Sequence, residues 1–96
     1  MDSIIKRDRK DVCFLCGYCG ATERHHIFGG NPNRKKSEKY GLVVHLCHYC
    51  HNEAPNGVHQ NADNALTLHR IGQYNWETYY KKSTADFIAE FGKNYL

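Results

Sequence analysis

Short apolar runs near the middle of the chain indicate two β-strands. Residues 42–46 (LVVHL) are a β-branched apolar run that predicts a strand. Residues 21–28 (ATERHHIF) predict a second short strand that carries two adjacent histidines. The segment 29–41 between them has three glycines, one proline and two asparagines, a composition that predicts a loop.

Apolar residues at helical spacing predict two helices in the last third of the chain. One begins near Asn61, and the other near Ser83 or Thr84, either of which can cap it. The two apolar faces consist of Ala65, Leu68, Gly72, Trp76 and Tyr79, and of Phe87, Ile88, Phe91 and Tyr95. Core packing is the simplest interpretation of both, with stacking of Trp76 on a substrate as the alternative. A short helix from His48 to about Glu53 is also expected, before a Pro-Asn-Gly turn.

These elements predict one small α+β domain. We expect residues 1–11 to form an exposed basic arm, and residues 12–96 to form a single domain whose first segment, 12–20, is a knuckle turn. A chain of 96 residues buries proportionally little surface, so a bound metal or a disulfide is expected to add stability.

Five cysteines supply candidates for such a staple. Two CxxC pairs, Cys13 with Cys16 and Cys47 with Cys50, have the spacing that lets two thiolates reach one tetrahedral zinc. The spacing leaves Cys19 open as a replacement, because Cys16 and Cys19 are also a CxxC pair. Disulfides are the alternative, but the charged N-terminal segment is unlike a secretory signal. We therefore expect reduced thiols, zinc and a cytoplasmic setting.

The distribution of basic residues is compatible with a nucleic-acid partner. The net charge is only +3, but basic residues gather in two clusters. The clusters are Lys6, Arg7, Arg9 and Lys10, and Arg34, Lys35, Lys36 and Lys39. For either cluster taken alone, a solvated surface is the preferred interpretation. No run approaches the roughly 20 apolar residues of a membrane span, so no membrane partner is expected.

Seven histidines are many for this length, and four of them are spaced suggestively. His25 and His26 are adjacent at a strand end, where one ring can face a metal and the other a nearby water. His51 follows a candidate zinc cysteine, and His59 comes after the Pro-Asn-Gly turn. Together, His25, His51 and His59 predict a metal site with open positions. For His45, His48 and His69 we expect ordinary surface positions, or for one of them a place on the structural zinc instead of a cysteine.

These motifs resemble those of the HNH endonucleases, of the His-Me finger or ββα-metal superfamily, and most closely their small phage-encoded members. The resemblance covers about residues 12–60 and is weaker over Leu68-His69 and the C-terminal tail. It rests on Cys13-x-x-Cys16-Gly17, Thr22-Glu23-Arg24-His25-His26-Ile27-Phe28-Gly29-Gly30, Asn33-Arg34, Ser37-Glu38-Lys39-Tyr40-Gly41-Leu42, Leu46-Cys47-x-x-Cys50-His51-Asn52 and Gly57-Val58-His59.

The resemblance implies a zinc-stapled ββα-metal finger followed by C-terminal helices. It implies that His26 is the general base, that His25 and His51 are ligands of one catalytic divalent metal, and that Cys13 and Cys16 hold zinc while Cys19 is spare. Two departures stand out. The family's middle asparagine is missing near Leu42, so we look to Asn33 or Asn52 for a replacement. A second helical histidine would fall on Pro55, and His59 is taken in its place.

The resulting hypothesis is a nuclease that hydrolyses phosphodiester bonds of DNA, with RNA not excluded. It needs structural Zn²⁺ and one catalytic Mg²⁺, Mn²⁺, Ni²⁺ or Zn²⁺. Arg34 or a neighbouring lysine would clamp the phosphate in catalysis. The alternatives are a non-catalytic zinc module that binds nucleic acid, and a phage structural or packaging accessory. Packaging or recombination proteins of a phage, in its bacterial host's cytoplasm, are the expected partners of the nuclease.

Overall fold

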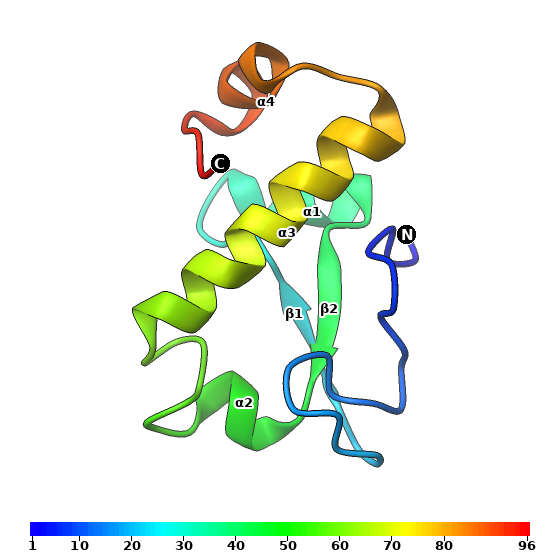
Figure 1. Ribbon diagram of the computed structural model, residues 1–96, viewed down its shortest axis with the longest axis vertical. Coiled ribbons are helices and arrows are strands. Elements are labelled where there is room, and N and C mark those ends of the chain that lie inside the picture. The colour runs from blue at the N-terminus through cyan, green and yellow to red at the C-terminus, as the bar shows by residue number, and fades with distance from the viewer.

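A two-stranded antiparallel sheet lies at the centre of the chain, with helices around it (Figure 1). The computed structural model describes residues 1–96. Its elements in chain order are β1 Glu23–His26, α1 Asn33–Tyr40, β2 Val43–Leu46, α2 His48–Asn52, α3 Ala62–Tyr80 and α4 Thr84–Phe91. The α+β prediction is confirmed. None of the helices is long and apolar enough to span a membrane.

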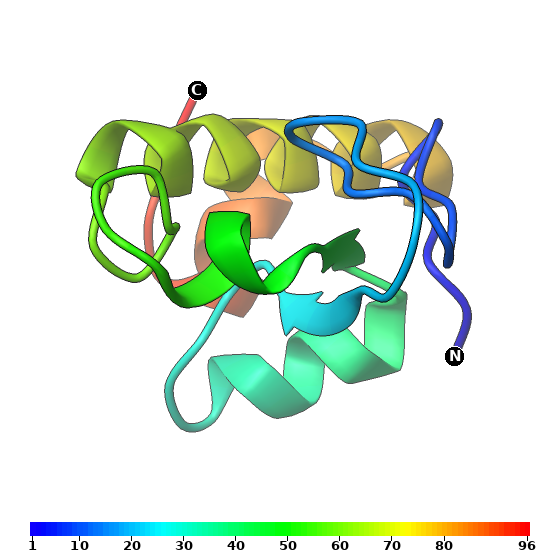
Figure 2. The same cartoon turned by 90° about the horizontal axis from the view of Figure 1, so that it is seen from below.

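The register of the sheet places the two adjacent histidines on opposite sides. His25 pairs with Val44 and His26 with Val43. Seen from below, the sheet lies between α3 on one side and α1 on the other (Figure 2). Alternate residues of a strand point to opposite faces, so Glu23 and His25 share one face while Arg24 and His26 share the other.

Helix α1 contradicts the predicted loop at residues 29–41. The glycines and the proline that suggested a loop lie at the ends of this segment, whereas its centre, NRKKSEKY, is rich in good helix formers. Gly41 ends the helix with φ +73°, and its amide donates to the carbonyls of Ser37 and Glu38. A Cβ at Gly41 would lie 2.5 Å from the Asp2 carbonyl oxygen, so this position requires glycine.

Helices α3 and α4 supply the aromatic core against the sheet. Leu68, Trp76, Phe87 and Phe91 are buried, as their helical spacing predicts. Tyr79 and Ile88 were expected on the same apolar faces but are exposed, because those faces are narrower than predicted. Gly72 lets α3 approach the end of β1, since a Cβ there would meet the Ile27 side chain at 2.8 Å. Asn61 and Ser83 cap the two helices through their side chains.

The N-terminal segment is only partly the exposed arm that was expected. Its four basic side chains are exposed, but Ile5 is buried in the core. Asp8 accepts hydrogen bonds from both the backbone amide and the Nδ1 of His45, at 2.8 and 2.7 Å. The segment therefore packs along β2, because burying Ile5 offers apolar contact that a separate arm would lack.

Candidate functional site

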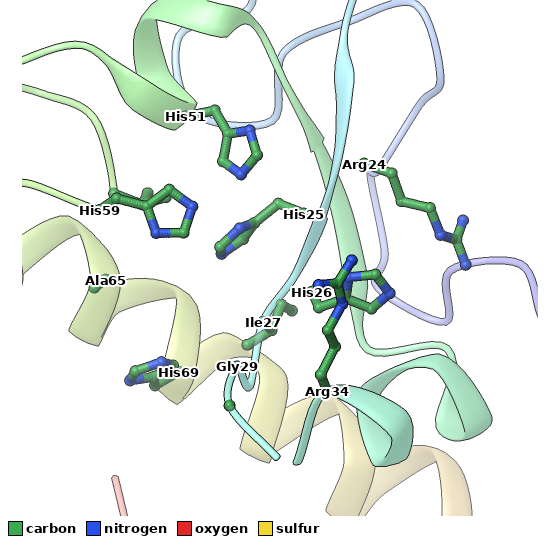
Figure 3. Close-up of a pocket in the computed structure, with 12 residues that line it drawn as sticks. Arg24, His25, His26, Ile27, Gly29, Arg34, His51, His59, Ala65 and His69 are labelled. Carbon is green, nitrogen blue, oxygen red and sulfur yellow. The ribbon is translucent and has the colours of Figure 1, made fainter. Parts of the chain in front are cut away.

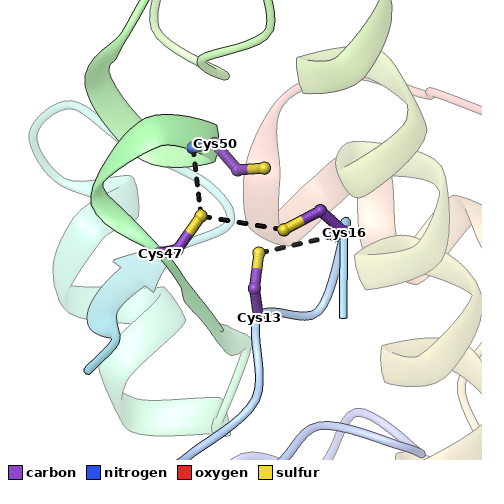
Figure 4. Close-up of side chains that lie close together, drawn as sticks. All are labelled: Cys13, Cys16, Cys47 and Cys50. Atoms are coloured by element: carbon purple, nitrogen blue, oxygen red, sulfur yellow. Dashed lines mark hydrogen bonds between the residues drawn. The ribbon is translucent and has the colours of Figure 1, made fainter. Parts of the chain in front are cut away.

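Four cysteine sulfurs converge where the N-terminal knuckle meets the start of α2 (Figure 4). They belong to Cys13, Cys16, Cys47 and Cys50, and all lie within 4.8 Å of one another. A tetrahedral zinc with Zn–S bonds of about 2.3 Å needs sulfur–sulfur edges of about 3.8 Å. The sulfurs of Cys16 and Cys47 are 3.8 Å apart. The cluster can therefore hold a structural metal such as zinc.

Backbone amides around this cluster favour the thiolate form of Cys13. Burial opposes a thiolate at Cys13, but hydrogen bonds from the amides of Cys16, Cys47 and Leu15 and from the Cys16 thiol together outweigh it and lower the pKa of Cys13 to about 7. Burial and the neighbouring thiols raise the pKa of Cys50. The cluster therefore favours a thiolate at Cys13 and disfavours one at Cys50.

Cys19 lies apart from the other four cysteines. Its thiol is exposed and donates to the Gly17 carbonyl oxygen at 3.6 Å. The structure thus groups the same four cysteines that the resemblance selected, and leaves out the one that spacing alone could not exclude.

A second cluster consists of the three histidines His25, His51 and His59 (Figure 3). One ring nitrogen from each lies within 4.8 Å of the other two, and the ring centroids are 4.8 to 5.5 Å apart. They come from β1, from α2 and from the loop before α3, so the fold alone brings them together. Imidazole nitrogens suit zinc, nickel and other transition metals.

Burial keeps the central histidine neutral. His25 is only 9% exposed, and this burial, followed by the nearby His51 and His59, lowers its pKa to about 3. A neutral imidazole has a free lone pair, whereas a protonated one cannot bind a metal. At neutral pH, His25 is therefore ready to coordinate without releasing a proton.

A carboxylate orients the second histidine of this cluster. Glu23 accepts a hydrogen bond from His51 Nδ1 at 2.8 Å and another from His48 Nδ1 at 3.0 Å. These bonds lower the pKa of Glu23, with that from His51 as the largest cause. An ionised carboxylate only accepts, so neutral His51 carries its proton on Nδ1 and its lone pair on Nε2. Such an arrangement is typical of metal-binding histidines.

His26 lines the same pocket from the other face of β1. Its Nε2 lies 2.7 Å from Glu38 Oε2, and Glu38 also accepts from Arg24. The hydrogen bond from His26 is the largest cause that lowers the pKa of Glu38. The pocket around the histidines encloses about 530 Å³ and includes Arg34, Gly29 and Gly30 along its wall.

His69 reaches this pocket as well, although an ordinary surface position was expected for it. Its ring stacks on Phe28 with 5.3 Å between centroids, and burial lowers its pKa. The other two histidines lie outside the pocket. His45 fastens the N-terminal segment through Asp8, and exposed His48 pairs with Glu23 and Glu53.

The second basic cluster divides into two parts on α1. Arg34 lines the pocket, and Lys35 beside it is exposed. Lys36 instead reaches α4, where its ammonium contacts the backbone and side chain of Glu90. The ammonium of Lys39 lies 5.0 Å from the ring centre of Tyr40. Of the predicted phosphate-binding residues, only Arg34 faces the histidines.

The two candidate asparagines also have different places. Asn52 donates to Glu23 Oε1 at 3.0 Å and so touches the support of His51. Asn33 donates to the Phe91 carbonyl oxygen at 3.4 Å and is thereby directed at α4. Sequence reasoning did not single out Glu23 or Glu38 for the site. Strand alternation could have identified Glu23, because it lies two residues before His25 on the same face of β1. Glu38 had no such signal, because it lies on α1, where the composition predicted a loop.

Comparison of the chain with protein-family models, with curated protein sequences and with solved structures gives no match.

Proposed function

We propose that this protein is a metal-dependent endonuclease of the HNH type that hydrolyses phosphodiester bonds of DNA. The observation that carries the proposal is the convergence of three imidazoles beside a fourth, His26, which faces the same pocket and is held by a carboxylate. A purely structural metal site does not need such a neighbour. A hydrolytic site does, because a water molecule must lose a proton as it attacks phosphorus.

The donor set fits a catalytic divalent metal. Three nitrogen ligands leave coordination positions open, as in catalytic sites, whereas four cysteines close theirs, as in structural ones. When bound by His25, His51 and His59, the metal supplies the Lewis acidity that stabilises negative charge on the phosphate. His26 accepts the proton of the attacking water, and Arg34 contributes positive charge along the pocket wall.

The order of elements supports the same family. Two antiparallel strands followed by α2 is the order of a ββα finger, and α2 carries His51. The strands are not joined by a tight hairpin here, since α1 is inserted between them. The family's middle asparagine has no direct counterpart, and Glu38 contacts His26 instead.

A non-catalytic zinc module that binds nucleic acid is the competing proposal. The four-cysteine cluster and the exposed basic residues favour it equally. It does not explain why three histidines lie close enough to bind one metal. It also does not explain why carboxylates hydrogen-bond His51 and His26.

A plasmid-nicking assay separates the two proposals. We expect the zinc-loaded protein to nick supercoiled DNA with at least one of magnesium, manganese, nickel or zinc. His26→Ala should slow cleavage by about 10²–10⁴-fold, the usual range for removal of an acid–base group. The control is Tyr74→Ala, which changes an exposed residue of α3 outside the pocket and should cut normally. Wild type that binds DNA but cuts with none of these metals would support the binding module.

A further inference from the structure

The Glu38 carboxylate contacts two side chains, Arg24 and His26, from the face of β1 that is turned toward α1. Its Oε2 is 2.7 Å from His26 Nε2 and 3.3 Å from Arg24 Nε, and its Oε1 is 2.9 Å from an Arg24 terminal nitrogen. We propose that Glu38 is a positioning residue that holds His26 with its proton on Nε2, and so makes Nδ1 the nitrogen that faces the chemistry. The role of Nδ1 rests on the proposed nuclease function, but the positioning itself does not.

The charge of Glu38 decides which nitrogen of His26 carries the proton. Arg24 presents two donors to this carboxylate, an arrangement that favours the ionised form. An ionised carboxylate has no proton to donate, so the 2.7 Å contact requires His26 Nε2–H as the donor. A neutral imidazole has only one N–H, which leaves the lone pair on Nδ1.

The backbone holds both partners in register. Arg24 and His26 are two residues apart on β1, so both project toward α1. The residue before Glu38, Ser37, is fully buried, and its hydroxyl accepts from the Phe28 amide and donates to the Phe28 carbonyl oxygen, at 3.0 and 2.9 Å. This clamp fixes α1 to the chain just beyond His26. The Glu38 side chain is 46% exposed and is held by Arg24 and by the N-terminal ammonium, which lies 3.6 Å from Oε1.

The opposite arrangement occurs across the strand. Glu23 accepts from Nδ1 of His51 and thereby leaves Nε2 free, whereas Glu38 accepts from Nε2 of His26 and leaves Nδ1 free. The two carboxylates thus select opposite tautomers for the two histidines. A free Nε2 suits His51 as a ligand in the histidine cluster. A free Nδ1 suits His26 as a general base that lies beside the cluster and is not part of it.

Nitrogen NMR on ¹⁵N-histidine-labelled, zinc-loaded protein tests the positioning without reference to activity. At mildly alkaline pH, His26 should show a protonated Nε2 and an unprotonated Nδ1. In Glu38→Gln, whose neutral amide can also donate, this preference should be reduced or reversed. His51 should keep its tautomer in that variant. Glu53→Gln, which removes a carboxylate paired with a histidine outside the pocket, is the matched control and should leave His26 unchanged.

Cleavage kinetics of the same proteins provide the second readout. Glu38→Gln should lower kcat about tenfold to hundredfold with little change in KM, and Glu38→Asp should recover part of the activity. A wild-type His26 protonated on Nδ1 would overturn the proposal, even if a variant fails to fold, and so would an unchanged tautomer in Glu38→Gln. If the tautomers behave as expected and no protein cuts DNA, the nuclease proposal fails while the positioning stands.

Discussion

Glu23 and His51 are 28 positions apart in the chain and are joined by a 2.8 Å hydrogen bond between Oε1 and Nδ1. The bond connects the first strand to the short helix that follows the second. It also turns the free nitrogen of His51 toward His25 and His59. Glu23 therefore connects the strand pairing to the geometry of the candidate metal site.

Removing the charge of Glu23 should weaken metal binding without removing a ligand. Glu23→Gln is expected to lower affinity for a divalent metal at the histidine cluster by about 10- to 100-fold, because the supporting carboxylate raises the basicity of His51 and fixes its ring. Isothermal titration of the zinc-loaded protein with nickel or manganese measures this change. Glu53→Gln is the control, and equal affinities for all three proteins would show that Glu23 does not support the site.

The cysteine cluster should hold about one zinc per chain, and folding should depend on it. Cys47→Ser is expected to release this zinc and to unfold or precipitate, because the sheet and the knuckle then have no common anchor. Elemental analysis and circular dichroism provide the measurements. Cys19→Ser should retain zinc and fold normally, since its sulfur lies outside the cluster. Well-folded wild-type protein without zinc would contradict this prediction.

Buried His25 should make stability depend on pH. Its pKa falls from 6.5 to about 3 on folding, so the unfolded chain takes up a proton below about pH 6.5 while the folded chain does not. The free energy of unfolding should therefore decrease as the pH falls, by roughly 1 kcal/mol between about pH 7 and about pH 5.5 for this group. Denaturant titrations of zinc-loaded protein without a second metal measure it. His25→Gln should lack this component, and an equal slope in both proteins would assign it to other groups.

The basic residues of α1 should separate into DNA-binding and structural ones. Neutralising Arg34 and Lys35 is expected to weaken DNA binding and to reduce the salt slope by about 0.9 for each DNA phosphate that the variant no longer neutralises. Lys36→Gln should instead lower thermal stability with little effect on that slope, because its ammonium is engaged by Glu90. Fluorescence anisotropy over a salt series tests both. A larger slope change for Lys36→Gln than for the double variant would reverse the assignment.

Local patterns were sufficient for the two strands and the last two helices, whereas the choice of Cys13 and Cys16 over Cys19 needed the family resemblance. Alternation and helical spacing report which side of an element is buried, and most of the core followed from that. Helix α1 was not found, because its short polar sequence has no apolar stripe and its flanking glycines suggested a loop. Glu38 was missed with it, since its contact with His26 depends on where that helix is placed.

The histidine cluster was proposed from residue type and from the family resemblance, and the distances were beyond sequence reasoning. His59 illustrates the difference. Nothing in its local sequence fixes how far the Pro-Asn-Gly turn carries it, yet its ring lies 4.8 Å from that of His51. The packing of the N-terminal segment was likewise unpredictable, because contacts that anchor it, such as that of Asp8 with His45, join residues 37 positions apart.

Cys50 and His51 are consecutive residues of the five-residue helix α2, yet one belongs to the cysteine cluster and the other to the histidine cluster. We therefore expect metal binding at one cluster to affect metal affinity at the other, although they share no ligand. If zinc at the cysteines raises the affinity of the histidines for a second metal, that metal raises the affinity of the cysteines for zinc by the same factor. A chelator that strips the cysteines would thus disable the histidines as well. If the proposed nuclease function holds, the supply of zinc would then regulate cleavage from outside the histidine cluster.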